Sequence, residues 1–165
     1  MIIDGREIGP HKPPYIIWEA SCNHGGSLDN AMKLIRAAKD AGADAIKWQA
    51  YTADTITIDH NSNEFIIQAG PWKGSKLHQL YSTTETPFEW FPALFGFART
   101  LGITPFASVF DKSSVDMLER LDCPAYKIAS MEITDTVLIE YAAKTWKPLI
   151  ISTGMSTLSE VEEGL

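Results

Sequence analysis

The stretch Tyr15-Ile-Ile-Trp-Glu-Ala-Ser-Cys-Asn-His-Gly-Gly26 begins as a short apolar run and turns polar within a few residues. The run predicts a buried β-strand over residues 15–20, and the closing Asn-His-Gly-Gly cannot continue as regular strand. Glu19 sits where the strand meets this loop. A carboxylate at the carboxyl end of a buried strand is typical of the active site of a parallel α/β barrel.

Three later segments repeat the pattern of a short apolar strand with a polar residue at or near its carboxyl end. They are Ala45-Ile-Lys-Trp-Gln-Ala50, Ala125-Tyr-Lys-Ile-Ala-Ser130 and Leu149-Ile-Ile-Ser-Thr-Gly154. A further strand is predicted over 103–109. Capping residues and helical periodicity predict helices between and after these strands, over 27–42, 87–101, 111–121, 137–145 and 157–165. Strands that alternate with helices indicate parallel βα units.

Two architectures fit this alternation. An open doubly wound sheet usually has a GxGxxG turn after its first strand, and Asn-His-Gly-Gly is not such a turn. Polar residues at the ends of several different strands favour an α/β fold of the (β/α)₈ TIM-barrel type. Because about five βα units are present, residues 1–165 are predicted to be the N-terminal part of a barrel, an incomplete barrel by themselves.

Composition excludes several classes of protein. The chain is 45% apolar and 21% charged, which is typical of a globular protein. A net charge of -7 argues against nonspecific nucleic-acid binding. No apolar run reaches the ~20 residues of a membrane span, and the N-terminus lacks the layout of a secretory signal. We therefore expect a cytoplasmic protein without a membrane partner, and Cys22 and Cys123 are expected to be reduced thiols.

Residues 51–86 break the βα rhythm. An insertion of this length directly after a strand is usually functional, and its aromatic and apolar residues favour an ordered lid or wall over a floppy surface excursion. Thr86 is then predicted to be the N-cap of the next helix, with Pro87 at its first position. Residues 2–9 predict a small hairpin around Asp4-Gly5.

Side chains alternate along a strand, so parity selects which residues face the barrel interior. A tryptophan belongs against the outer helices and not in a narrow barrel, which places Trp48 outside. Glu19, Lys47 and Gln49 then face inward. A buried Glu19–Lys47 pair that merely fills the barrel is the structural alternative, but such pairs stabilise weakly because desolvation offsets their attraction.

Lys127 contributes a second inward cation, and hydroxyls follow at the strand ends in Ser130, Ser152 and Thr153. Each hydroxyl alone could equally cap a helix. Together with two lysines they predict a site for phosphate or carboxylate. His24, in the loop after the first strand, is expected to make hydrogen bonds within the loop and not to bind a metal.

Four motifs resemble the sialic acid synthase family in order and spacing. They are Glu19-Ala-Ser-Cys-Asn-His-Gly-Gly26, Ala41-Gly-Ala-Asp-Ala-Ile-Lys-Trp-Gln49, Tyr126-Lys-Ile-Ala-Ser130 and Ile151-Ser-Thr-Gly-Met155. The middle of the chain looks closest to the pseudaminic acid synthases. That likeness runs through Tyr51-Thr-Ala-Asp-Thr-Ile-Thr57, Leu77-His-Gln-Leu-Tyr81 and Thr86-Pro-Phe-Glu-Trp90.

The resemblance implies a (β/α)₈ barrel followed by a small antifreeze-like domain that is absent from these residues. It implies condensation of phosphoenolpyruvate with an N-acylated amino sugar to a nine-carbon 2-keto sugar acid. The resemblance also implies a homodimer and a divalent metal, Mn²⁺ or Mg²⁺, that polarises the sugar aldehyde. The family's two metal-binding histidines are expected beyond Leu165, so no metal ligand is predicted in this chain.

By motif, Glu19 resembles the family's catalytic acid or base. The residues that resemble phosphoenolpyruvate ligands are Lys47, Ser108, Lys127, Ser130 and Ser152. Those that resemble the sugar-side wall are Gln49, Tyr51, Asp54 and Trp72. The sequence departs from the family at Ala107-Ser-Val-Phe110, where the family has Ser-Thr-Pro-Phe, and at Trp18, where the family has a small residue.

Three other functions fit the same residues. N-Acetylneuraminate synthesis differs only in the amino sugar. A class I aldolase would also place a lysine at a barrel strand end, for Schiff-base chemistry. A truncated and inactive paralogue would bind an anion or pair with another chain. On its own, a chain with no complete metal site is expected to have little or no activity.

Overall fold

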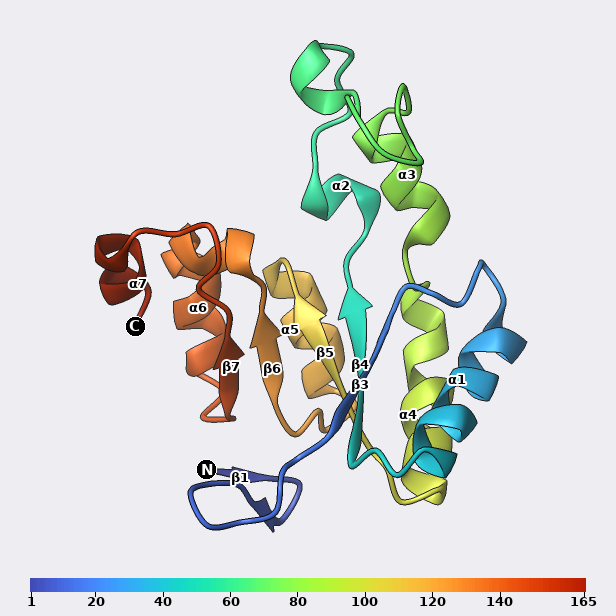
Figure 1. Ribbon diagram of the computed structural model, residues 1–165, viewed down its shortest axis with the longest axis vertical. Coiled ribbons are helices and arrows are strands. Elements are labelled where there is room, and N and C mark those ends of the chain that lie inside the picture. The colour runs from blue at the N-terminus through green and yellow to red at the C-terminus, as the bar shows by residue number, and fades with distance from the viewer.

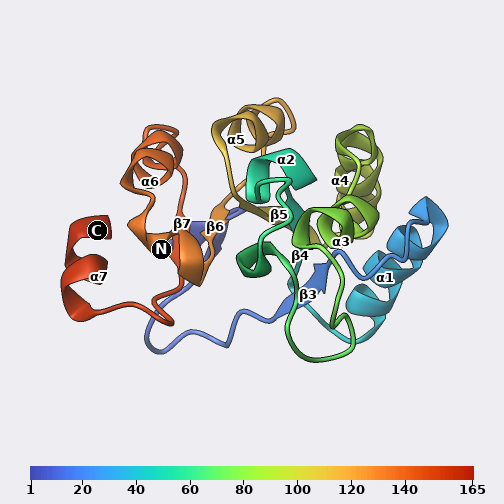
Figure 2. The same cartoon turned by 90° about the horizontal axis from the view of Figure 1, so that it is seen from above.

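A computed structural model describes all residues 1–165. Its centre is a five-stranded parallel sheet in which every strand pairs with the next one along the chain. The strands are β3 (Ile17–Ser21), β4 (Ala45–Ala50), β5 (Thr104–Val109), β6 (Tyr126–Ile128) and β7 (Leu149–Ile151). Seen from above, the sheet curves and the helices form an arc along its outer side (Figure 2). The predicted incomplete barrel of five βα units is confirmed, with β3 and β7 as its two open edges.

Four of the five helices that accompany the strands begin at a capping side chain, and α4 is the exception. The α-helices of the barrel are α1 (Leu28–Asp40), α4 (Phe91–Thr100), α5 (Lys112–Glu119), α6 (Thr136–Ala143) and α7 (Leu158–Gly164). Ser27, Asp111, Asp135 and Thr157 each accept a backbone N–H at the start of a helix. No helix in the structure is both long and apolar enough to span a membrane.

Thr86 departs from its predicted role. A 3₁₀ turn, η2 (Phe88–Trp90), precedes α4, and the hydroxyl of Thr86 caps neither. Its Oγ1 instead lies 3.1 Å from His24 Nε2, and both residues are buried. The Thr86 hydroxyl bonds to this distant residue because leaving it unpaired at a buried position would be unfavourable. His24 Nδ1 also accepts the backbone N–H of Gly26 at 3.1 Å, which confirms the prediction that His24 makes a hydrogen bond within its loop.

A short hairpin covers the amino ends of the strands, as predicted. It pairs β1 (Ile2–Ile3) with β2 (Arg6–Glu7) and lies below the sheet in Figure 1. Arg6 forms an ion pair with Asp44, whose other oxygen accepts the backbone N–H of Ile16 at 2.7 Å. Ile3 is buried in the main core. The hairpin therefore closes the end of the barrel opposite to the carboxyl ends of the strands.

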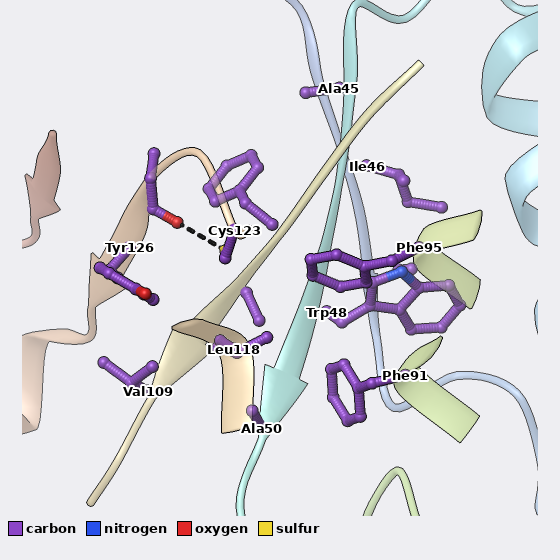
Figure 3. Close-up of a cluster of buried hydrophobic side chains, with 14 of the residues drawn as sticks. Ala45, Ile46, Trp48, Ala50, Phe91, Phe95, Val109, Leu118, Cys123 and Tyr126 are labelled. Carbon is purple, nitrogen blue, oxygen red and sulfur yellow. Dashed lines mark hydrogen bonds between the residues drawn. The ribbon is translucent and has the colours of Figure 1, made fainter. Parts of the chain in front are cut away.

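The outer face of the sheet forms the core. Ile46, Trp48 and Ala50 of β4 are fully buried, and Figure 3 shows Trp48 beside Phe91 and Phe95 of α4. The intervening Lys47 and Gln49 are only partly buried and face the other way. Parity predicted this division correctly, because a strand has two faces and only one packs against helices.

Residues 51–86 form a structured excursion above the carboxyl end of β4 (Figure 1). The excursion contains α2 (Ala53–Ile56), η1 (Asn63–Phe65) and α3 (Leu77–Thr84), with an antiparallel bridge between Ile66 and Lys76. Its two ends are tied together. Glu85 accepts the backbone N–H of Ala53 at 2.8 Å, and Tyr51 Oη lies 3.0 Å from Thr84 Oγ1. These bonds make an ordered wall, as the composition indicated, and not a floppy loop.

Candidate active site at the carboxyl ends of the strands

Glu19 and Lys47 face each other across β3 and β4. The register pairs the two residues, and Lys47 Nζ forms an ion pair with Glu19 Oε2. Glu19 Oε1 accepts both the backbone N–H and the hydroxyl of Ser21, each at 3.0 Å. The register shifts between Glu19 and Ser21, and Ser21 has a φ of +50°. Irregularities of this kind in a strand are common beside active sites. The predicted juxtaposition of Glu19 and Lys47 is confirmed.

Ser108 and Lys127 continue this row of polar residues across the sheet. Ser108 is opposite Gln49 on one side and opposite Lys127 on the other. Lys47 Nζ donates to Ser108 Oγ at 3.3 Å, so the hydroxyl lies between the two lysine strands. Three neighbouring strands thus bring two cations and a hydroxyl to one face, which is the composition of an anion site.

The electrostatics of Lys127 reflect this crowding. Burial lowers the pKa of Lys127 below its ordinary value, and the positive charge of Lys47 lowers it further. Glu132 and Glu19 oppose that shift. Lys127 Nζ donates only to the carbonyl of its neighbour Ile128. An anionic ligand bound between the lysines would relieve their mutual repulsion, which favours binding of an anion here.

The two serines at later strand ends lie on adjacent loops. Ser130 begins the 3₁₀ turn η3 (Ser130–Thr134), and Ser152 follows β7 with its N–H bonded to Ile128 O at 3.1 Å. A Cβ placed on Gly154 would stand 3.1 Å from Ser130 Oγ, so the two loops are in contact. Neither serine hydroxyl makes a hydrogen bond within the protein. Both remain free for a ligand, and their role in binding phosphoenolpyruvate stays a prediction.

A cavity of about 300 Å³ adjoins this row of polar residues. We call it the mouth cavity; it lies between the ends of β3, β4 and β6 and the excursion, and its lining includes Cys22, Gln49, Tyr51, Trp72, Leu80 and Met131. Three of the four residues predicted for the sugar side therefore meet in one place. Asp54 does not join them: it pairs with His78 Nε2 at 2.8 Å on the outer surface, with an 88% exposed side chain. Its role in sugar binding stays a prediction.

Glu132 was missed by the sequence reasoning. Its Oε2 is buried without a hydrogen-bond partner, and burial raises the pKa of its carboxyl group. The positive charge of Lys127 partly offsets that rise. The signal was a carboxylate in the turn η3 that follows β6, the strand of Lys127. Glu19 likewise lies near the carboxyl end of its strand, β3. Two carboxyl groups with different surroundings can divide the roles of proton acceptor and proton donor.

No group of three or more His, Cys, Asp or Glu that could hold a metal ion occurs in residues 1–165. Glu19 is paired with Lys47, and Glu132 Oε2 is buried without a hydrogen-bond partner. His24 is buried, and its two ring nitrogens are hydrogen-bonded to Thr86 and Gly26. The residues described here do not fit a metal centre.

Comparison with known proteins identifies the family to which this chain belongs. The family model described as NeuB family matches residues 34–165. The chain belongs to the NeuB family. The resemblance inferred from the four motifs is thereby confirmed, and the matched residues include every strand of the polar row except β3.

Curated relatives and a solved structure agree with this assignment. A pseudaminic acid synthase of Campylobacter jejuni is 47% identical over 150 residues, which are 91% of this chain and 44% of that protein. A pseudaminic acid synthase of Helicobacter pylori is 42% identical over 154 residues, covering 93% of this chain and 45% of that protein. The chain thus spans less than half the length of these relatives.

The crystal structure of the N-acetylneuraminic acid (sialic acid) synthetase of Leptospira borgpetersenii superposes with a TM-score of 0.84 at 31% identity. It covers 99% of this chain, which corresponds to 53% of that structure. The parallel sheet described above is therefore the sheet of a TIM-barrel-type synthase fold. The fold class predicted from strand and helix alternation is confirmed.

Proposed function

We propose that this protein condenses phosphoenolpyruvate with an N-acylated amino sugar to a nine-carbon 2-keto sugar acid, as a pseudaminic acid synthase does. One observation carries the proposal: Lys47, Ser108 and Lys127 stand side by side on three strands, next to two carboxyl groups. This anion site lies in a chain that is 47% identical to a pseudaminic acid synthase. Phosphoenolpyruvate carries both a phosphate and a carboxylate, which suits two lysines with hydroxyls between and beside them.

The proposed reaction makes one carbon–carbon bond and breaks one carbon–oxygen bond. The C3 carbon of phosphoenolpyruvate forms a bond to the aldehyde carbon of the open-chain sugar, and the aldehyde oxygen becomes a hydroxyl. Water adds at C2, and the C2–O bond to phosphate breaks, with its electron pair leaving on phosphate. One proton of the water ends on the new sugar hydroxyl, and the other leaves with phosphate.

The two carboxyl groups are suited to opposite ends of this proton transfer. Glu19, bound to Lys47 and Ser21, is placed to take the proton of the attacking water. Because burial raises the pKa of Glu132, its carboxyl group holds a proton more readily and suits the donor to the new hydroxyl. Lys47 and Lys127 hold the phosphate and carboxylate while their charge stabilises the departing phosphate.

The experiment uses the protein expressed from the complete reading frame. Phosphate release should require phosphoenolpyruvate and an acylated amino sugar together. In ¹⁸O-labelled water the released phosphate should carry no ¹⁸O, because the C–O bond breaks and not the P–O bond. Labelled phosphate, or release without the sugar, would indicate simple phosphatase chemistry and overturn the proposal.

The choice of amino sugar is part of the proposal. The pseudaminic acid synthases of Campylobacter jejuni and Helicobacter pylori are 47% and 42% identical, against 31% for the N-acetylneuraminic acid synthetase of Leptospira borgpetersenii. We therefore propose the pseudaminic acid precursor as the preferred substrate over N-acetylmannosamine. Comparing kcat/KM for the two sugars decides between them, and a higher value for N-acetylmannosamine would reverse the assignment.

A class I aldolase is the competing reaction, and the lowered pKa of Lys127 favours it, because a neutral amine is the nucleophile in Schiff-base formation. Borohydride reduction in the presence of pyruvate should leave this protein unmodified if it condenses phosphoenolpyruvate. A trapped adduct on Lys127, found by mass spectrometry, would support the aldolase instead.

We also propose that the activity requires Mn²⁺ or Mg²⁺, that the metal ligands lie outside residues 1–165, and that the enzyme is a cytoplasmic homodimer. The absence of a metal-binding cluster among these residues motivates the second part. Residues 1–165 expressed alone should release no phosphate. The complete protein should lose activity in EDTA and recover it with Mn²⁺, and activity of the isolated segment would contradict the proposal.

A further inference from the structure

Ser21 is held in a backbone conformation that a serine rarely adopts. Its φ of +50° lies in the left-handed region, which disfavours residues with a Cβ atom. The register between β3 and β4 also shifts between Glu19 and Ser21, so the strand is irregular at this residue. Backbone strain of this kind persists only where the surrounding structure holds it, and it gathers at functional sites. In this conformation Ser21 turns two hydrogen-bond donors toward a single carboxylate oxygen.

These two donors leave the oxygens of Glu19 in different situations. The backbone N–H and the hydroxyl of Ser21 each donate to Glu19 Oε1 at 3.0 Å. Because a carboxylate oxygen has about two acceptor positions, these bonds occupy Oε1. The other oxygen, Oε2, pairs with Lys47 and keeps one acceptor position. The oxygen of Glu19 that can still accept a proton from water is therefore Oε2.

The side chain of Glu19 is not held in place by burial. It is 47% exposed, and a glutamate has several rotatable bonds through which it can turn toward solvent. A single ion pair at such exposure holds it only weakly. A general base must lie within hydrogen-bond reach of the proton that it takes. The two bonds from Ser21 supply the restraint that burial and Lys47 do not.

We infer that Ser21 is a positioning residue, which holds Glu19 by Oε1 so that Oε2 takes the proton of the attacking water. This inference rests on the proposed function, which makes Glu19 the base. The hydroxyl of Ser21 donates to Glu19 and to no other group of the protein. Its loss should therefore appear in kcat, which reports the chemical step, and much less in the KM for phosphoenolpyruvate.

The test uses variants of the complete protein that separate the hydroxyl from the backbone strain. Ser21→Ala and Ser21→Gly both lose the hydroxyl. Both should lower kcat about tenfold, which is part of the roughly 10²- to 10⁴-fold that a positioned base supplies. In urea, Ser21→Gly should unfold at a higher concentration than Ser21→Ala, because glycine adopts a positive φ without strain. The two variants thus differ in stability and agree in kcat.

Ser21→Thr supplies the opposite combination. It keeps a hydroxyl but adds a branched Cβ, which suits the left-handed region poorly. It should unfold at a lower urea concentration than Ser21→Ala. Its kcat per folded molecule, with the folded fraction taken from circular dichroism, should nevertheless lie closer to the wild type than that of Ser21→Ala. The order of the three variants in kcat is therefore expected to differ from their order in stability.

Trp146→Gly is the matched control. Trp146 also has a positive φ, +60°, but its side chain is 94% exposed in the loop before β7, at the other end of the strands from Glu19. This variant should leave kcat unchanged. If Ser21→Gly keeps the wild-type kcat, or if kcat follows stability among the three Ser21 variants, the inference is wrong while the proposed function stands. If the complete wild-type protein releases no phosphate from phosphoenolpyruvate with any acylated amino sugar, both are wrong.

Discussion

The two faces of β4 differ in what they contribute to the protein. Ile46, Trp48 and Ala50 point to the helices and are fully buried, whereas Lys47 and Gln49 point to the barrel interior and form part of the polar row. One face of this six-residue strand thus packs in the hydrophobic core, and the other carries polar residues of the candidate active site. Substitutions one position apart should therefore have effects of different kinds, and this separation can be tested.

The largest effect is expected on the buried face. Trp48→Ala should lower the free energy of unfolding by about 3–5 kcal/mol, because it removes a fully buried indole packed beside Phe91 and Phe95. Urea denaturation measures the change, and the activity per folded molecule should stay within a few fold of the wild type. Trp146→Ala, at a residue 94% exposed, is the control and should cost less than about 0.5 kcal/mol. Equal losses for the two variants would contradict the assignment of Trp48 to the core.

The opposite result is expected one residue earlier. Lys47→Met should reduce kcat/KM by about 10²–10³-fold, the usual effect of removing one charge-stabilising donor. Its effect on unfolding should stay below about 1 kcal/mol, because Glu19, its partner, is 47% exposed and can be solvated by water. Lys33→Met, on the exposed face of α1, should change neither quantity. A loss of stability like that of Trp48→Ala would remove the distinction between the two faces.

His24 lies on neither face of β4, and its effect on stability should depend on pH. Burial lowers its pKa below the ordinary 6.5, so the unfolded chain takes up this proton first as the pH falls. Stability is therefore complete above about pH 6.5 and decreases below it, by at most about 1.4 kcal/mol per pH unit. Urea unfolding at pH 7.5 and 5.5 should show a larger decrease for the wild type than for His24→Gln. The same pH dependence in both proteins would exclude His24 as its source.

The smallest effect is expected at the base of the excursion. Glu85→Ala removes the acceptor of the Ala53 N–H and should destabilise the protein by about 1 kcal/mol. Because this bond ties the two ends of the excursion, KM should rise for the amino sugar and not for phosphoenolpyruvate. Glu85→Gln keeps an acceptor oxygen and should restore most of the loss, and Glu89→Ala is the exposed control. A rise in KM for phosphoenolpyruvate instead would place the excursion beside the anion site.

Local and alternating patterns in the sequence predicted the parts of the fold that depend on them. Ser27 and Asp111 cap helices as expected, and parity separated Lys47 from Trp48 without knowledge of the fold. Thr86 was misassigned because its partner, His24, lies 62 residues away, and no local pattern reports such a bond. For the same reason Glu132 was missed, since burial of its carboxyl group depends on how the turn after β6 packs.

The order of the strands has a further consequence for chain entropy. Each strand of the sheet pairs with the next in sequence, and only β4 and β5 are separated by the excursion as well as by a helix. Closing this connection, which is two to three times as long as the others, costs only about 0.9 kcal/mol more, because closure entropy grows with the logarithm of length. A barrel of this kind can therefore lengthen or shorten residues 51–86 at little thermodynamic expense. The wall of the mouth cavity is the part of the molecule that can change most freely while the polar row stays in register.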